Sequence, residues 1–143
     1  MKKILIILMV FFITKGANAQ AGVSDTLAYV NQIKANKSQY IGKPFSVLLA
    51  DLQAGIKFFT PRSGMSAYKN KETSTGFYFI IPEYMEDFGS YNFEIKWATP
   101  LDRAVTDQIY GSGQYAGQWR PEPAQYYGTG IIADIVVDWR YNN

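Results

Sequence analysis

Hydrophobic residues first recur at helical spacing shortly after residue 24. Ser24 is a good N-cap residue, and Leu27, Val30 and Ile33 follow it at intervals of three. The pattern ends in the polar residues 36–38. The sequence therefore predicts a short amphipathic helix that starts at residue 24 or 25 and ends before residue 36.

A second helix is marked more strongly. Pro44 suits the first helical position, where the missing N–H of proline costs nothing, and Gly55 can adopt the left-handed conformation that ends a helix. Between them the apolar positions fall at i, i+3, i+4 and i+7, namely Phe45, Leu48, Leu49 and Leu52. This stripe predicts a helix over residues 44–54 that packs on another element, because so short a helix is marginal alone.

The later part of the chain has the alternation of apolar and polar residues that is typical of β-strands. The predicted strands cover residues 56–60, 75–81, 91–99 and 127–141. Residues 75–81 are apolar on both faces, which predicts an interior strand. The apolar side of the third strand comprises Tyr91, Phe93, Ile95 and Trp97.

The last predicted strand, residues 127–141, has the longest alternation. Its inner face would comprise Ile131, Ala133, Ile135, Val137 and Trp139. Its outer face would carry Asp134, Asp138 and Arg140. A shift of one residue would bury these charges, so the pattern also predicts the register. Glu94 and Lys96 are expected on the same outer side, which favours cross-strand charge pairing.

The segments between the strands contain Gly, Pro, Ser and Asn and no long helical pattern, which favours antiparallel pairing. Residues 100–110 fit either a brief helical turn or a bulged extension of a strand. We predict an α+β fold, in which two N-terminal helices pack on one face of a four-stranded antiparallel sheet. This order of elements over residues 24–143 resembles the beta-lactamase-inhibitor-like architecture and that of outer-membrane-assembly lipoproteins of the BamE type. The resemblance implies protein–protein contacts in the bacterial envelope.

The first nineteen residues have the layout of a secretory signal peptide. Lys2 and Lys3 precede ten unbroken apolar residues, 4–13, and the small residues Ala17 and Ala19 then mark a cleavage site. Ten apolar residues are half of the about 20 that a membrane-spanning helix needs. The sequence predicts a cleaved segment 1–19 and one domain over residues 20–143. It also predicts a periplasmic or secreted location, with no stable membrane insertion after cleavage.

Composition then removes several classes of function. The chain has no cysteine and no histidine, which excludes Ser-His-Asp and Cys-His catalysis and zinc sites built on those residues. Removing Lys2, Lys3 and Lys15 with the signal segment leaves 11 of the 14 basic residues against 12 acidic ones, so the net charge changes from +2 to −1. The mature chain therefore offers no charge-based case for nucleic acid as a partner.

One long segment between predicted strands is rich in aromatic residues. Residues 110–127 show no pattern of secondary structure, and loops longer than about 12–15 residues of this kind tend to be functional or disordered. Tyr and Trp rings beside amide and guanidinium donors can stack on a sugar or hold a peptide. The candidate binding residues are Tyr115, Trp119, Arg120 and Tyr126. In the alternative interpretation the segment folds back, and Trp119 with some of the tyrosines caps an open end of the sheet.

The carboxylates do not form a catalytic pattern. Asp134 and Asp138 share a strand face, but at about 3.3 Å per residue they lie about 13 Å apart, too far for a glycosidase pair or a shared metal. The acidic residues 83, 86 and 87 lack the spacing of a calcium loop, and the glycines within 111–117 lack that of a nucleotide-binding loop. We predict no catalytic residues, no metal and no cofactor.

The sequence thus predicts an exported, non-enzymatic binding module that presents residues 110–127 to a protein or a glycan of the bacterial envelope. Two alternatives stay open. One is a small carboxylate-dependent glycan hydrolase that brings together acids from separate elements, such as Glu83, Glu86, Asp102 or Glu122. The other is a structural subunit of an envelope assembly that pairs with its partner through an edge strand.

Overall fold

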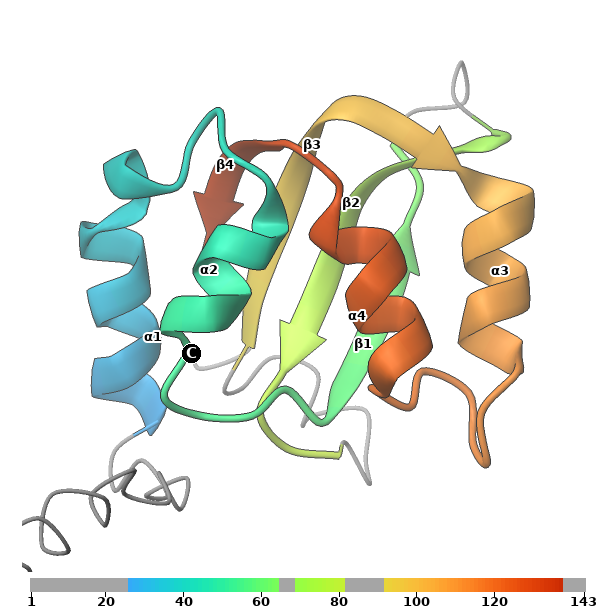
Figure 1. Ribbon diagram of the computed structural model, residues 1–143, viewed down its shortest axis with the longest axis horizontal. Helices are drawn as coiled ribbons and strands as arrows, with labels where there is room; N and C mark the ends of the chain where they lie inside the picture. Colours follow the sequence, from blue (N-terminus) through green and yellow to red (C-terminus); the bar gives the residue numbers. More distant parts are fainter. Residues whose placement is uncertain (1–25, 65–68, 82–91, 138–143) are drawn as a thin grey trace, which may run out of the picture.

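A computed structural model of the chain describes residues 26–64, 69–81 and 92–137. Helix α1 (Thr26–Ala35), the 3-10 turn η2 (Lys37–Gln39) and helix α2 (Phe45–Asp51) come first, followed by strands β1 (Phe58–Arg62), β2 (Lys71–Tyr78) and β3 (Asn92–Asp102), helices α3 (Arg103–Gly111) and α4 (Pro121–Gly128), and strand β4 (Ile132–Val136) (Figure 1). This is an α+β fold with one four-stranded antiparallel sheet, as predicted.

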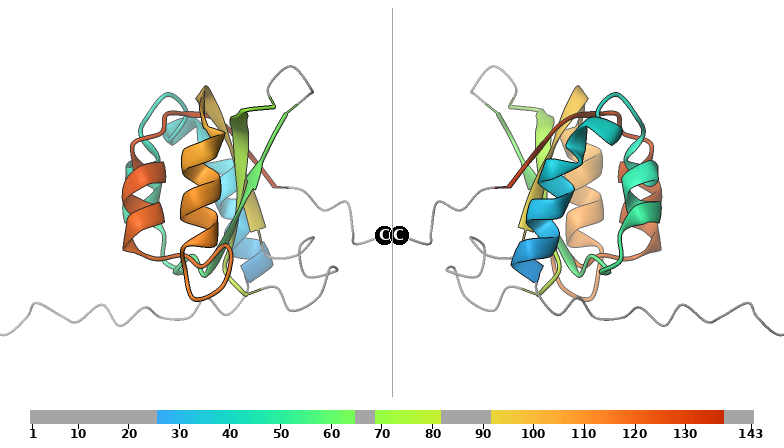
Figure 2. Two further views of the ribbon diagram at one scale, coloured as in Figure 1. Left: turned by 90° about the vertical axis from the view of Figure 1, so that its right-hand side faces the viewer. Right: turned by 90° about the vertical axis from the view of Figure 1, so that its left-hand side faces the viewer.

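The strands lie in the order β1-β2-β3-β4, and every neighbouring pair is antiparallel. The interior strand predicted over residues 75–81 is confirmed for residues 75–78, because β2 lies between β1 and β3, but this strand begins earlier, at Lys71, and ends at Tyr78. The helices of the described residues all lie on one face of the sheet (Figure 2). Besides the two helices predicted at the N-terminus, this face also carries α3 and α4, which lie between β3 and β4 in the sequence.

Aromatic rings form the core between the sheet and the helices. Phe59, Phe77 and Phe93 lie opposite one another on β1, β2 and β3, and all three are fully buried. Phe45 of α2 packs on this row, with its ring centre 4.6 Å from that of Phe77. Because these side chains come from alternate positions of each strand, the sheet turns its most apolar face toward the helices.

Helix α2 begins one residue later and ends earlier than its pattern predicted. Pro44 is its N-cap, and the helix stops at Asp51, where Leu52 takes an extended conformation (φ −66°, ψ 123°). The hydroxyl of Tyr29 in α1 accepts the backbone N–H of Gln53 at 2.7 Å, in place of the helical partner that this N–H would have had. A contact from α1 thus accompanies the end of α2, and Gly55 does not end the helix.

The last predicted strand is shorter than expected and has a different register. Residues 121–128 form α4, and β4 begins only at Ile132. Lys96 pairs with Asp134 but Trp97 pairs with Ile132, so Ala133 is the extra residue of a β-bulge. The bulge turns Ile132 inward (0% exposed) and leaves Ile131 at 38% exposed, which corrects the predicted inner face of Ile131 and Ala133. Ile135 and Val137 are buried as predicted; residues 138–140 lie outside the described part of the chain.

Residues 100–110 contain both of the structures considered for them, a strand extension and a helix. The strand β3 continues to Asp102, and α3 begins at the next residue. The Asp102 side chain caps that helix by accepting the backbone N–H of Ala104 at 2.9 Å. This sharp junction brings α3 back over the helical face of the sheet (Figure 1).

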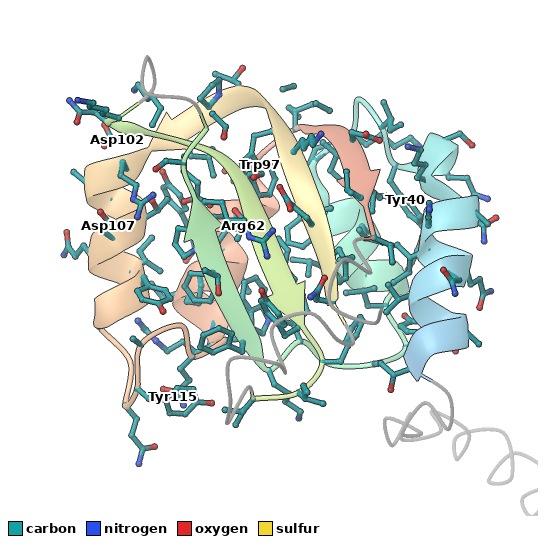
Figure 3. All side chains as sticks on the ribbon, turned by 180° about the vertical axis from the view of Figure 1, so that it is seen from behind. Tyr40, Arg62, Trp97, Asp102, Asp107 and Tyr115 are labelled. Atoms are coloured by element: carbon teal, nitrogen blue, oxygen red, sulfur yellow. The ribbon has the colours of Figure 1, made fainter. Side chains whose placement is uncertain are left out.

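The outer face of the sheet carries the predicted charges that lie within the described residues. Lys96 of β3 lies directly opposite Asp134 of β4, as the predicted cross-strand pairing requires, but the close ion pairs on this face are made with other residues. Arg62 of β1 lies on this face (Figure 3) and reaches across β2 to Glu94 of β3 (2.6 Å) and to the hydroxyl of Tyr78 (3.1 Å). Gly76 makes this route possible, because a Cβ there would lie 3.2 Å from the guanidinium. Asp134 pairs with Lys37 of η2 at 2.7 Å. The lysine holds the pKa of the Asp134 carboxyl below its usual value.

Segments of the chain cover parts of both sheet edges. On β1, the Phe59 N–H donates to the Gly117 carbonyl (2.9 Å), and Pro61 has no N–H to offer. On β4, the Ile132 N–H donates to the Lys43 carbonyl (3.0 Å). No helix within the described residues is long and apolar enough to cross a membrane.

Candidate binding pocket

The sequence suggested that residues 110–127 form a long loop without secondary structure, and this prediction is wrong. The segment contains the end of α3, a turn over residues 112–119 and most of α4. Helix α4 begins with Pro121, and Pro123 also lies in its first turn, where backbone N–H groups have no helical partner. The two prolines therefore start this helix rather than interrupt it.

The turn is attached to the edge of β1. The backbone N–H of Phe59 donates to the carbonyl of Gly117 (2.9 Å), and the backbone N–H of Trp119 donates to the carbonyl of Lys57 (3.1 Å). Gly117 has a φ of 78°, a conformation that favours glycine, and a Cβ at this position would clash with the ring of Phe58. These contacts fix the direction in which the chain leaves the turn and so place Trp119 over the core.

Trp119 lies between the aromatic core and an open pocket. Its ring centre is 5.4 Å from that of Phe77 and 6.4 Å from that of Tyr127. The pocket beside it has a volume of about 200 Å³ and lies between α2, the segment that follows α2, and α4. Its lining residues are Leu49, Leu52, Ala54, Gly55, Ile56, Trp119 and Ala124. The structure thus places one of the predicted binding residues in the wall of an open pocket that is lined by apolar side chains and by polar backbone groups.

The other predicted binding residues have different surroundings. Tyr115 is at the exposed tip of the turn (37% exposed) (Figure 3). Arg120 joins the two helices, because its guanidinium donates to the Ile109 carbonyl at the end of α3 (3.1 Å), to the Ser112 hydroxyl and to Glu122 of α4. Tyr126 packs against the core, and burial raises the pKa of its hydroxyl. Trp119 and Tyr126 therefore take the capping position that the alternative interpretation described.

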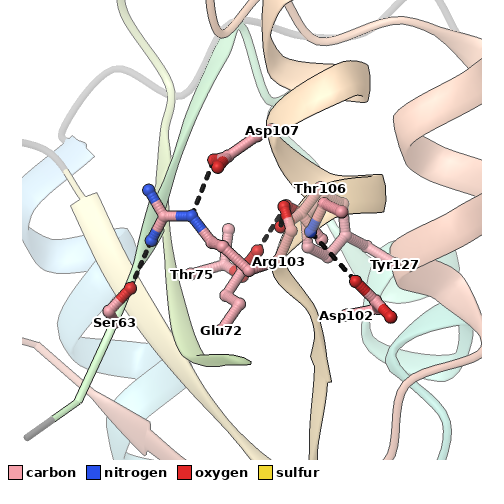
Figure 4. Close-up of polar contacts among 9 residues, drawn as sticks. Ser63, Glu72, Thr75, Asp102, Arg103, Thr106, Asp107 and Tyr127 are labelled. Carbon is pink, nitrogen blue, oxygen red and sulfur yellow. Dashed lines mark hydrogen bonds and ion pairs between the residues drawn. The ribbon is translucent and has the colours of Figure 1, made fainter. Parts of the chain in front are cut away.

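A buried polar cluster lies deeper, where β2 meets α3 and α4 (Figure 4). Glu72 is fully buried, and one of its carboxyl oxygens accepts the Tyr127 hydroxyl at 3.1 Å. Thr75 and Thr106 also hydrogen bond to this carboxyl group. Trp97 extends the cluster, because its Nε1 donates to the Thr75 hydroxyl at 2.9 Å. These side chains from β2, β3, α3 and α4 satisfy one another and bind the four elements together.

Sequence reasoning missed this cluster. Strict alternation back from Phe77 and Thr75 would point Glu72 outward, toward solvent. The pairing of β2 with β3 shifts between Glu72 and Ser74, however, and this irregularity turns the carboxyl group inward. No residue pattern in the strand indicates where such a shift occurs.

The remaining described carboxylates mostly have structural partners. Asp102 caps α3, Asp107 pairs with Arg103 of the same helix, and Glu122 pairs with Arg120. Within the ranges that the structure describes, no three acidic side chains gather in a way that could hold a metal ion. Glu83 and Glu86 lie outside those ranges.

No protein-family model matches the chain, and no curated protein or solved structure matches it significantly. The resemblance to the envelope architectures named above therefore stays a prediction about the order of elements.

Proposed function

We propose that this chain is an exported, non-enzymatic binding module that receives one apolar side chain of a protein partner in the pocket beside Trp119. The observation that carries the proposal is the lining of that pocket. Its seven residues are aliphatic, aromatic or glycine, and they come from three separate parts of the helical layer. Such a pocket suits the anchor residue of a protein interface, since interface hot spots are large apolar or aromatic side chains held in desolvated pockets.

The size and chemistry of the pocket favour an apolar side chain over a sugar. Small-molecule sites have volumes of about 300–1,000 Å³ and a few well-placed polar groups. This pocket has about 200 Å³, and its lining offers no charged or hydroxyl side chain that could bind sugar hydroxyls. The protein arm of the predicted function is therefore the better supported one.

Attachment of a partner strand to the sheet is less favourable. Gly117 covers the backbone of β1 at Phe59, and Lys43 covers that of β4 at Ile132. A partner strand would first have to displace these segments. The surface between α2 and α4 needs no such rearrangement, because its pocket is already open.

The test is to fill the pocket without removing any core contact. Ala124→Leu adds three carbon atoms to the α4 wall, whereas Ala50→Leu makes the same change at an exposed position of α2 and is the matched control. A photo-cross-linking amino acid at the exposed residue Gln125 of the exported chain identifies its neighbours in the native envelope. A peptide copied from the cross-linked site is then titrated against the purified protein, with tryptophan fluorescence as the signal.

We expect Ala124→Leu to weaken peptide binding about 30-fold, which corresponds to the about 2 kcal/mol of a hot-spot contact. Ala50→Leu should change the affinity by less than about two-fold, as is usual for exposed substitutions. Equal affinity of Ala124→Leu and the parent protein would refute the proposal. If Ala116→Leu abolished binding instead, the exposed turn beside Tyr115 would be the contact surface. A glycan that bound tightly while no peptide did would also overturn it.

A further inference from the structure

The carboxyl group of Glu72 has two ways to satisfy its hydrogen bonds, one for each protonation state. When it is ionised, the hydroxyls of Thr75, Thr106 and Tyr127 can all donate to it. When it carries a proton, it needs an acceptor. The Thr106 hydroxyl can take this role, because its own proton can turn to the Arg103 carbonyl, which lies 3.3 Å away in the first turn of α3. The Thr106 hydroxyl is thus the group that changes partner when Glu72 gains or loses a proton.

This cluster is connected to the pocket through α4. Tyr127, which donates to Glu72, lies three residues after Ala124, so the two side chains share one face of that helix. The ring of Tyr127 is also stacked on Trp119, with an angle of 29° between the ring planes. Two pocket-lining residues therefore depend on how closely Tyr127 is held against β2.

We propose that Glu72 makes the pocket beside Trp119 sensitive to pH. With Glu72 protonated, α4 is held firmly against β2 and the pocket keeps its shape; loss of that proton places a charge in the core, loosens α4 and weakens binding at the pocket. The effect on binding rests on the function proposed above, whereas the loosening of α4 does not.

The charged groups around Glu72 leave the buried carboxylate without a direct ion pair. Arg103 of α3 is the nearby cation, but its guanidinium bonds to Asp107 (2.6 Å) and to Ser63, as Figure 4 shows. At this end of β3, Asp102 adds a negative charge, and α4 contributes Tyr126 and Tyr127, whose hydroxyls titrate far above neutral pH. The positive charge of Arg103 is thus divided among several partners.

Burial raises the pKa of the Glu72 carboxyl, and it outweighs the three hydroxyl donors and Arg103, all of which lower it. The folded protein therefore holds this proton more tightly than the unfolded chain does. The stability that Glu72 contributes is complete below its ordinary pKa of 4.5 and is lost as the pH rises through the folded-state pKa.

The first arm of the test needs no ligand. Urea unfolding midpoints of the parent protein and of Glu72→Gln are measured from pH 4.5 to pH 9, with Glu122→Gln as the control for loss of an exposed carboxylate. We expect the midpoint of the parent to fall with rising pH relative to that of Glu72→Gln, and Glu122→Gln to follow the parent. At a single alkaline pH, hydrogen exchange of the α4 amides should be faster in the parent than in Glu72→Gln, while α1 exchanges equally in both. Parallel stability curves, or equal exchange of α4, would overturn the proposal.

Tyr127→Phe provides a second variant that keeps the ring. It removes a donor that lowers the pKa of Glu72 in the folded protein, so the fall in the unfolding midpoint should extend to higher pH. A fall that ends at the same pH in Tyr127→Phe and in the parent would show that Glu72 is not the titrating group. The second arm repeats the peptide titration across the same pH range. If α4 loosens with pH but no peptide binds at any pH, the proposed binding function is refuted and the pH sensitivity of α4 stands. If the peptide binds with the same pH dependence in the parent and in Glu72→Gln, the proposed role of Glu72 is refuted and the binding function stands.

Discussion

Two glycines with the same backbone φ make it possible to measure how tightly the turn before Trp119 packs against β1. Gly42 and Gly117 both have a φ of 78°. A Cβ at Gly42 would meet nothing within 4 Å, whereas at Gly117 it would lie 2.7 Å from the Cζ atom of Phe58 and 2.6 Å from the backbone oxygen of Phe59. Gly42→Ala therefore measures the backbone cost alone, and Gly117→Ala adds the close contact with β1.

The cost of the left-handed backbone and the cost of the close contact with β1 can each be given a magnitude. A left-handed conformation costs a non-glycine residue about 1–2 kcal/mol, which is the whole effect expected for Gly42→Ala. Overpacking of a well-filled core costs about 1–3 kcal/mol more, so Gly117→Ala should lose about 2–5 kcal/mol of unfolding free energy. The carbonyl of Phe59 cannot yield easily, because it belongs to β1 itself, and the turn is the part that must move.

Urea unfolding followed by far-UV circular dichroism gives both free energies, and tryptophan fluorescence reports whether Trp119 has moved. We expect Gly117→Ala to be at least about 1 kcal/mol less stable than Gly42→Ala. We also expect its native fluorescence to differ from that of the parent, whereas Gly42→Ala keeps the parent spectrum. Equal stability of the two variants would refute the conclusion that Gly117 holds the turn against β1.

Three further changes examine other contacts. Trp97→Phe should cost about 2–3 kcal/mol of unfolding free energy, because the Nε1 donor to the Thr75 hydroxyl is lost and the smaller ring leaves a void in the core; equal stability would show that neither the hydrogen bond nor the packing of the indole contributes. Lys37→Met should raise the pKa of Asp134, measured by carboxyl NMR titration, because the ammonium group is the largest cause of its lowering; an unchanged pKa would exclude that cause. Arg120→Met should cost about 1–3 kcal/mol in urea unfolding, since the guanidinium joins α3 to α4; unchanged stability with lost peptide binding would instead make Arg120 a ligand contact.

The prediction from sequence succeeded where side-chain periodicity and burial agree. Phe93, Ile95 and Trp97 alternate along one strand, and all three are buried on the helical side of the sheet. The stripe of α2 was equally informative, because Phe45 and Leu48 must both face the sheet. In these segments the backbone period alone decides which residues are inside.

Helix α4 was missed because residues 110–127 were interpreted as one long loop, although the proline argument used for the helix after Pro44 applies here too. Pro121 and Pro123 lie in the first turn, where no N–H is required, and Glu122 between them suits the positive end of the helix dipole. Ala124 and Tyr127 then share a face. The signal for a helix was therefore present, and its interpretation as a loop made Trp119 seem freer than the structure shows it to be.

The register of β4 and the position of Glu72 could not have been predicted in the same way. Both depend on irregular pairing with β3, next to Trp97 in one case and next to Leu101 in the other. Such bulges result from the fit between strands that are distant in sequence. A single strand's pattern carries no information about them, which is why the buried carboxyl group and the exposed Ile131 both came from the structure alone.

The position of α3 and α4 between two neighbouring strands bears on the order in which the chain folds. Strands β1, β2 and β3 follow one another and can pair through local contacts, but β4 can join β3 only after the intervening helices have closed a long loop. Trp119 and Ala124 belong to that late segment. We therefore expect the three-stranded part of the sheet to form before the pocket does, so that a chain caught midway through folding would have its sheet but not its binding surface.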